Sequence, residues 1–214
     1  MIKVIAFDFD GVLVESGGVK TSAFAQLFCP YGPDIEKKVV AHHLEYGGIS
    51  RYEKVRYYFE HFMQKTISQE EVNHICERFS EIVVEDVIEA HYVSGAKEFF
   101  QTTSLPLFIV SGTPQAELEH IVQQRSMEPF FQGIYGSPTK KTFWLKTILD
   151  TGHWKPSELL FIGDSLSDYS AAVETNVHFI GRLSAPTIHF DGLSRVDFIV
   201  SDLQHLSIYI KLME

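Results

Sequence analysis

Hydrophobic residues occur along this chain in short uninterrupted runs, separated by longer stretches of mixed polarity. The runs are rich in β-branched and aromatic residues, as in strands buried on both faces. They lie at residues 2–7, 105–110, 133–135, 158–162, 177–180 and 197–200. Between them, apolar positions recur with helical spacing at residues 95–102, 114–125, 141–150 and 168–174. This alternation predicts an α/β fold, with a parallel sheet flanked by helices.

Residues 16–90 interrupt the alternation, because they contain amphipathic segments but no convincing strand. Residues 50–63 and 68–87 carry apolar side chains at helical spacing, and Ser68 with Glu71 predicts a capping box at the start of the second segment. The simplest organisation is an α/β core made of residues 1–15 and 91–214. A helical unit, residues 16–90, is then inserted after the first strand.

The chain has 214 residues and a formal net charge of −10, which argues against a nucleic-acid backbone or an anionic membrane surface as partner. No apolar run reaches the length of a membrane span, and Asp8 and Asp10 interrupt the N-terminal run before a signal peptide could form. The two cysteines, Cys29 and Cys76, are expected to be buried free thiols. We therefore predict a cytoplasmic protein, either monomeric or dimeric.

Two carboxylates follow the first hydrophobic run directly, in the sequence "DFDGVLVES". Asp8 and Asp10 lie two residues apart and point to the same side, and Gly11 permits a tight turn away from the strand. Like charges beside an apolar strand are costly unless a positive charge offsets them. Open α/β sheets bind ligands at the carboxyl ends of their strands, so other segments that follow strands can complete such a site.

Two such segments offer groups that bind anions. Ser111, Gly112 and Thr113 follow the run at 105–110, where a hydroxyl and free backbone N–H groups suit an oxygen anion. The alternative is that Ser111 or Thr113 caps a helix that starts near Pro114. Lys140 and Lys141 stand at the start of another predicted helix, against its dipole, which is explained either by a carboxylate or phosphate partner or by simple solvation.

The last segment, "LLFIGDSLSD", again ends a buried run in a carboxylate, Asp164, and adds Asp168 four residues later. N-capping by Ser165, Ser167 or Asp168 is an alternative for Asp168, but it leaves Asp164 unexplained. Asp8, Asp10 and Asp164 together form an oxygen-rich set suited to Mg²⁺. A divalent cation is the positive charge that would allow these carboxylates to coexist.

In this order, the segments resemble the motifs of the haloacid dehalogenase-like (HAD) superfamily. These are D-x-D-G-x-L from Asp8, hydrophobic-S-G-T at Ser111, a lysine, and hydrophobic-G-D-S-x-x-D at Asp164. The resemblance covers residues 1–14 and about 92–200. The helical insertion resembles the C1-type cap of the phosphoglycolate phosphatase and β-phosphoglucomutase-like branch. The resemblance implies a Rossmann-like core and the use of Mg²⁺.

The resemblance also implies a role for each carboxylate. Asp8 is the expected nucleophile, which forms an aspartyl-phosphate. Asp10 is the expected general acid and then base, and its backbone carbonyl is a further metal ligand. Asp164 is a direct metal ligand, and Asp168 binds the metal through water or orients the lysine.

Ser111, with the backbone amide of Gly112 or Thr113, is expected to hold phosphoryl oxygens. One lysine neutralises the nucleophile and the phosphate together. The "GSPTxK" spacing favours Lys141, although the adjacent Lys140 remains open.

In C1-cap members a cap loop closes on the core and selects the substrate, and residues 45–54 are the best candidate here. Gly47 and Gly48 allow a sharp bend, and Arg51 could meet a second anionic group on the substrate. The alternative is an exposed first-turn arginine. His42 and His43 are expected to have ordinary surface or core roles.

The predicted function is therefore a Mg²⁺-dependent phosphatase for a small phosphorylated metabolite. The alternatives are a sugar phosphomutase of the β-phosphoglucomutase kind or a non-catalytic module on this fold.

Overall fold

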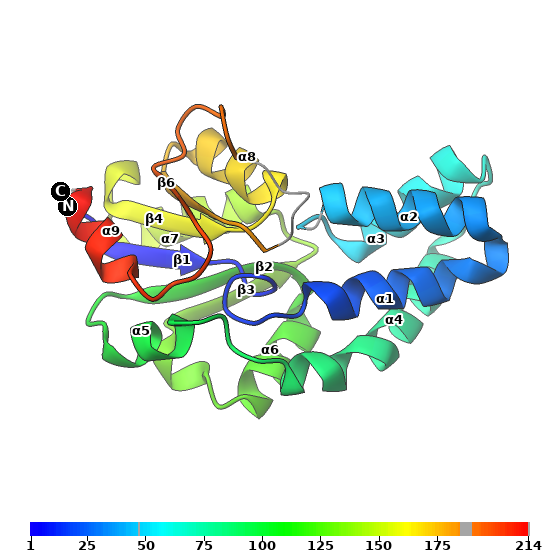
Figure 1. Cartoon of the computed structure of the whole chain (residues 1–214), viewed down its shortest axis with the longest axis horizontal. Helices are drawn as coiled ribbons and strands as arrows, with labels where there is room; N and C mark the ends of the chain where they lie inside the picture. Colours follow the sequence, from blue (N-terminus) through cyan, green and yellow to red (C-terminus); the bar gives the residue numbers. More distant parts are fainter. Residues whose placement is uncertain (47, 185–189, 214) are drawn as a thin grey trace.

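The computed structural model describes residues 1–46, 48–184 and 190–213. Within these residues a six-stranded sheet has the order β3-β2-β1-β4-β5-β6, and every neighbouring pair is parallel (Figure 1). The strands are β1 (Val4–Phe7), β2 (Leu107–Pro114), β3 (Gly133–Ser137), β4 (Leu159–Gly163), β5 (His178–Arg182) and β6 (Phe198–Val200). The predicted α/β fold with a parallel sheet is confirmed.

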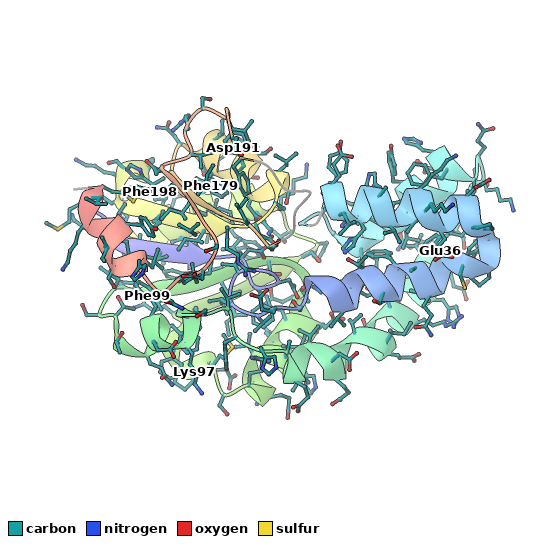
Figure 2. The ribbon with its side chains drawn as sticks, viewed as in Figure 1. Glu36, Lys97, Phe99, Phe179, Asp191 and Phe198 are labelled. Atoms are coloured by element: carbon teal, nitrogen blue, oxygen red, sulfur yellow. The ribbon has the colours of Figure 1, made fainter. Side chains whose placement is uncertain are left out.

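Alternate residues of the strands face two separate hydrophobic clusters. On one face, Ile5 and Phe7 share a cluster with α5 (Ala96–Thr102), α6 (Gln115–Gln124) and α9 (Leu206–Leu212). On the other face, Val4 and Ala6 pack with α7 (Lys141–Gly152) and α8 (Leu166–Thr175). Phe99 and Phe179, labelled in Figure 2, belong to the first and the second cluster respectively. The sheet is thus buried on both faces, as a parallel sheet requires.

The helices between β1 and α5 lie beside one end of the sheet (Figure 1). Their aromatic core brings Phe24 within 4.6 Å of Phe79 and Phe28 within 5.3 Å of Tyr58, measured between ring centroids. Ser68 and Glu71 form the predicted capping box. The division into a core and an inserted unit, with boundaries at 15/16 and 90/91, stays a prediction. The elements are α1 (Gly17–Phe28), α2 (Pro33–Glu45), α3 (Arg51–Tyr57), a π-helical turn (Tyr58–Phe62) and α4 (Gln69–Glu89).

Several local expectations differ from the structure. Strand β2 continues through Thr113 to Pro114, and α6 begins at Gln115 without a side-chain cap, so the helix-capping alternative for Ser111 and Thr113 is wrong. Cys76 is buried as expected, but Cys29 is exposed. Among the described residues, no helix combines the length and the apolar character needed to cross a membrane.

Candidate active site

Asp8 lies where β1 ends at the carboxyl edge of the sheet. Its backbone N–H donates to the carbonyl of Ile162 on β4 over 2.8 Å, which continues the strand pairing by one residue. The carboxylate accepts from the N–H of Phe9 over 2.7 Å. Its other oxygen is 2.9 Å from Nζ of Lys141. The nucleophile predicted from the sequence is therefore fixed by the sheet and paired with one of the predicted lysines.

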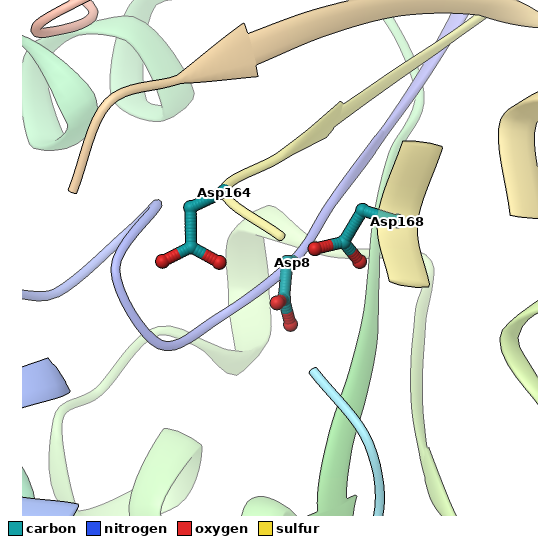
Figure 3. Close-up of side chains that lie close together, drawn as sticks. All are labelled: Asp8, Asp164 and Asp168. Carbon is teal, nitrogen blue, oxygen red and sulfur yellow. The ribbon is translucent and has the colours of Figure 1, made fainter. Parts of the chain in front are cut away.

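Asp164 and Asp168 come from the loop after β4 and from the first turn of α8, and they approach Asp8 (Figure 3). One carboxylate oxygen from each of the three residues lies within 4.8 Å of the others. Asp168 has a further task, because its Oδ2 accepts from the hydroxyl and the N–H of Ser165 in a capping box. Its Oδ1 lies 2.5 Å from Nζ of Lys141. Both Asp168 oxygens are therefore engaged by protein groups.

Burial dominates the electrostatics of this cluster. It raises the pKa of Asp8 well above its usual value, and the Asp168, Asp164 and Asp10 carboxylates add to this effect against the opposing Lys141. Burial and the Asp168 carboxylate raise the pKa of Asp164 to about 7, despite a hydrogen bond from Ser184. Burial lowers the pKa of Lys141, but Asp168 and Asp8 outweigh it, so the net pKa is raised. A cation at the carboxylates would relieve the repulsion that, together with burial, raises the pKa of Asp8 and Asp164.

Asp10 occupies a different environment. Its Oδ1 accepts from the Ser16 hydroxyl over 2.6 Å, and its Oδ2 accepts from Nζ of Lys20 over 2.5 Å and from the Thr113 hydroxyl over 2.9 Å. Burial alone would raise the pKa of Asp10, but the Lys20 ammonium and these hydrogen bonds outweigh it and lower the pKa. The pKa of Asp10 is therefore shifted in the opposite direction from that of Asp8, although a single residue separates the two.

These carboxylates lie in a cavity of 460 Å³ between the sheet edge and helices α1–α4. We call Asp8, Asp10 and Asp164 the cavity floor. Basic side chains from the helices line the same cavity, and we call them the cavity wall. The cavity wall comprises Lys20, His43, Arg51 and Lys54. Apolar side chains also line the cavity, and they are Phe24, Leu44, Ile49 and Phe79.

The backbone at Gly48 approaches the sheet edge so closely that a Cβ on Gly48 or on Gly112 would force neighbouring atoms to move. A Cβ placed on Gly112 would lie 2.6 Å from the carbonyl oxygen of Gly48. A Cβ on Gly48 would lie 2.5 Å from the Ser165 hydroxyl and 3.3 Å from Nζ of Lys141. The helical region and the sheet are therefore in backbone contact directly above the predicted phosphate-binding residues. Gly47, the other glycine singled out in the sequence, lies outside the described residues.

Among the other predicted anion-binding residues, Ser111, Gly112 and Thr113 line the same cavity. Ser111 and Thr113 are buried, and the Ser111 hydroxyl accepts from the backbone N–H of Thr113 over 3.1 Å. Of the two lysines, Lys141 is buried between Asp8 and Asp168, whereas Lys140 is exposed at the N-cap position of α7. The geometry favours Lys141 as the lysine of the cluster.

Arg51 differs from both interpretations of the sequence. It is not an exposed first-turn residue, since its side chain is only 5% exposed. Its guanidinium forms a bidentate ion pair with Glu117 of α6, donates to the Ser80 hydroxyl over 2.8 Å, and lies 4.3 Å from the Phe79 ring centroid. Arg51 reaches the cavity, but its donors already serve a carboxylate of the protein. Its role as a substrate contact stays a prediction.

Two lysines that line the cavity, Lys20 and Lys54, were not singled out in the sequence, and His43, which also lines it, was expected to have an ordinary surface or core role. Lys20 contacts Asp10, while Lys54 is 1% exposed and places Nζ 2.9 Å from Nδ1 of His43. Lys20 stands in the first turn of α1, so the dipole argument that identified Lys140 and Lys141 would also have identified Lys20. The sequence contains no such signal for Lys54 and His43. Their positions along the helices do not distinguish them from the other residues of the helical region.

Comparison with known proteins decides the family. The family model of the haloacid dehalogenase-like hydrolases matches residues 5–182, which is most of the chain. The chain belongs to this family. The resemblance read from the motifs is thereby confirmed. The described structure also has the parallel sheet that the motifs implied.

Individual relatives of this HAD-like hydrolase are more distant. A phosphoglycolate phosphatase from Photobacterium profundum is 29% identical over 101 residues, covering 44% of this chain and 44% of the relative. The chain thus matches less than half the length of that curated relative.

Solved structures extend the likeness to the whole chain. A β-phosphoglucomutase from Clostridium difficile has a TM-score of 0.79 at 18% identity, covering 100% of this chain and 97% of its own. A predicted phosphoglycolate phosphatase from Haemophilus somnus has a TM-score of 0.74 at 18% identity, covering 100% and 98%. At this identity the likeness establishes the fold alone.

Proposed function

We propose that this HAD-like hydrolase is a Mg²⁺-dependent phosphatase that acts on a small phosphorylated metabolite through an aspartyl-phosphate. The observation that carries the proposal is the arrangement around Lys141. Its ammonium lies between Asp8 and Asp168, and a third carboxylate, Asp164, completes the cluster. The family of the chain and the phosphatase among its relatives support the same reaction class.

The residues of the cavity floor fit a magnesium ion. Burial and mutual repulsion raise the pKa of Asp8 and Asp164, so the pair gains stability from a nearby cation. Asp8 and Asp164 would hold the ion with their carboxylates, and Asp10 with its backbone carbonyl, since the Asp10 carboxylate is engaged by Lys20, Ser16 and Thr113. When bound, Mg²⁺ supplies charge neutralisation for the nucleophile and the phosphoryl oxygens.

The chain's own residues divide the reaction into two displacements. An oxygen of Asp8 forms a bond to phosphorus while the ester P–O bond breaks, and the leaving oxygen takes a proton from the Asp10 carboxyl group. Asp10 then accepts a proton from water as the water oxygen attacks phosphorus, which releases inorganic phosphate and restores Asp8. The lowered pKa of Asp10 favours the ionised form that the second step needs, whereas the first step uses its protonated form.

Lys141 and the end of β2 orient the phosphoryl group. The Lys141 ammonium neutralises Asp8 and the incoming phosphate, and Asp168 orients this lysine. Ser111, with the backbone amides of Gly112 and Thr113, offers hydrogen-bond donors for the phosphoryl oxygens. Helices α1–α4 act as a cap, and the contact between Gly48 and Gly112 supports a closed cavity that admits small substrates.

Phosphate release from an aryl phosphate and from a panel of metabolites tests this proposal. We expect release that requires Mg²⁺, is abolished by EDTA and is lost in Asp8→Asn. The matched control is Asp150→Asn, which removes an exposed carboxylate on α7 and should leave the rate unchanged. Activity that survives in Asp8→Asn would contradict the nucleophile assignment. A phosphomutase would instead hydrolyse its substrate slowly. Adding a sugar bisphosphate would then make it isomerise a sugar phosphate.

A further inference from the structure

Arg182 is a buried arginine at the carboxyl end of β5, and its guanidinium joins three segments of the chain. Its Nε donates to the backbone carbonyl of Ser201, just after β6, over 2.9 Å. One terminal nitrogen donates to the carbonyl of Gly11 and to Oε2 of Glu15, each over 2.9 Å, and the other donates to Oε1 of Glu15 over 2.5 Å. Burying a guanidinium is costly unless its donors are matched, and these contacts supply the match.

The turn after Asp10 is the segment that Arg182 holds, and it packs directly on Asp164. A Cβ built on Gly11 would lie 2.0 Å from Oδ2 of Asp164, so the backbone there is in close contact with the carboxylate. In Figure 3 the blue ribbon that follows Asp8 curves beside Asp164. The backbone carbonyl of Asp10, which we propose as a ligand of Mg²⁺, is bonded to the nitrogen of Gly11. The position of Gly11 therefore sets how far this carbonyl lies from the Asp164 carboxylate.

The turn is closed by its own backbone and is also held at its far end. The N–H of Gly11 donates to the carbonyl of Val14 over 2.8 Å. The N–H of Glu15 donates to the carbonyl of His91, where the chain returns from α4, over 2.9 Å. Arg182 ties the turn to β5, which pairs with β4 beside the cavity floor. Loss of the guanidinium should therefore shift the turn relative to β4 without releasing it from its other contacts.

We infer that Arg182, together with Glu15, is a positioning residue for the divalent cation of the cavity floor. It holds the Gly11 turn against Asp164 and so fixes the spacing between the Asp10 backbone carbonyl and the Asp164 carboxylate. This inference rests on the proposed Mg²⁺-dependent function and deepens it, because it names a residue that sets the affinity for the cation through the turn. Groups that hold metal ligands in place typically change metal affinity about 10–100-fold when they are removed.

Binding of Mn²⁺ tests the inference without turnover, because this ion prefers the same oxygen ligands as Mg²⁺. The EPR signal of free Mn²⁺ gives its Kd, and competition with Mg²⁺ gives the Kd of Mg²⁺ at the same site. We expect Arg182→Met to raise both Kd values by about tenfold or more. Asp164→Asn, which removes a proposed ligand, should weaken binding at least as much and so show that the cavity floor is the site measured.

Further variants show that the guanidinium acts through its partners. Arg182→Lys keeps the charge but not the planar fork, so its Kd for Mn²⁺ should lie between those of the wild type and Arg182→Met. Glu15→Gln weakens one half of the ion pair, and we expect a rise of about three- to fivefold. Because Glu15 is 44% exposed, this variant should fold even if Arg182→Met does not. The matched control is Arg78→Met, an exposed arginine on α4, which should keep the wild-type Kd.

A purely structural role of Arg182 predicts a different result. The melting temperature would then fall, while the Kd for Mn²⁺, measured well below that temperature, would stay at the wild-type value. A wild-type Kd in Glu15→Gln and in folded Arg182→Met would overturn the inference and leave the proposed function intact. If the wild type itself binds no Mn²⁺ or Mg²⁺, the Mg²⁺-dependent function is contradicted, and the inference fails with it.

Discussion

The cavity floor and the cavity wall hold their charges by different structural means. On the floor, Asp8 and Asp164 follow β1 and β4, and the pairing of Phe7 with Ile162 brings the two strand ends together. On the wall, Arg51 belongs to α3, which reaches the cavity through packing among helices and through an ion pair with Glu117, 66 residues away. Floor positions are thus set by strand pairing, whereas wall positions depend on side-chain contacts between distant segments.

The two regions also differ in how far their charges are balanced. On the wall, Arg51 pairs with Glu117, and Lys20 pairs with the floor residue Asp10. On the floor, Asp8 and Asp164 face further carboxylates, and the pKa of each is raised. The wall is therefore expected to contribute to stability in the free protein, while the floor is expected to gain stability only when a cation binds.

The largest expected effect comes from breaking the ion pair of the wall. Arg51→Met leaves Glu117 buried without its cation, and we expect the free energy of unfolding to fall by about 3–5 kcal/mol. Urea unfolding measures this loss, and Arg51→Met with Glu117→Met should recover most of it. If Arg51→Met unfolds at the wild-type urea concentration and only raises KM, Arg51 is a substrate contact, as the sequence suggested.

The carboxylates of the cavity floor should make the folded protein less stable as pH rises, whereas an ordinary salt-bridged carboxylate makes it more stable. The pKa of Asp164 is about 7 in the folded protein and about 3.9 when unfolded, so the folded state binds more protons between these values. Metal-free protein should therefore lose stability as pH rises from about 4 to about 7, by on the order of 4 kcal/mol, and the raised pKa of Asp8 acts in the same direction.

Thermal unfolding across this pH range, with and without Mg²⁺, measures the effect. Asp164→Asn should be more stable than the wild type at about pH 8 without metal. The variant should also gain less stability from Mg²⁺, whereas Asp150→Asn should behave like the wild type. Stability that rises steadily with pH in the metal-free wild type would contradict the electrostatics assigned to the floor.

Lys141 is the cation already present beside the cavity floor, and its removal tests what that charge contributes. Lys141→Met removes the ammonium from Asp8 and Asp168, and we expect kcat to fall by about 10²–10³-fold. Lys140→Met is the matched control, because this neighbour is exposed. Steady-state kinetics with the best substrate decides between the two lysines, and equal losses in both variants would contradict the assignment.

The smallest effect is expected where the floor and the helical region touch. Gly112→Ala would place a methyl group 2.6 Å from the Gly48 carbonyl oxygen, so the backbone contact must open slightly. We expect a cost of about 1–3 kcal/mol, seen as roughly a tenfold or greater loss in kcat/KM. Gly17→Ala, where a Cβ meets no neighbouring atom, should retain wild-type kinetics. Unchanged kinetics in Gly112→Ala would mean that catalysis does not require this contact.

This contrast explains what could be predicted from the sequence. The strands and the acidic motifs could be predicted because each acidic motif follows a continuous hydrophobic run. Parallel strands end at one edge of a sheet, so these motifs were expected to meet there. Asp8, Asp10 and Asp164 line the cavity, and Lys141 lies 2.9 Å from Asp8. Local sequence sufficed here because the backbone alone sets these positions.

The wall was less predictable because its contacts join segments that are remote in sequence. The partner of Arg51 lies on α6, and the contact between Lys54 and His43 joins α3 to α2. Amphipathic spacing gives the buried face of each helix but not the residue that faces it across a helix pair. The short helix α9 was also missed, since its seven residues contain too few helical turns for a clear period.

The two roles of Asp168 affect how a mutation of this residue would be detected in a cell. One of its oxygens holds Lys141, and the other caps α8 through Ser165. A single substitution there would remove an active-site contact and fray a helix at once, lowering both the activity of each molecule and the number of folded molecules. A screen that scores only total activity would merge these losses, and protein abundance measured alongside it would separate them.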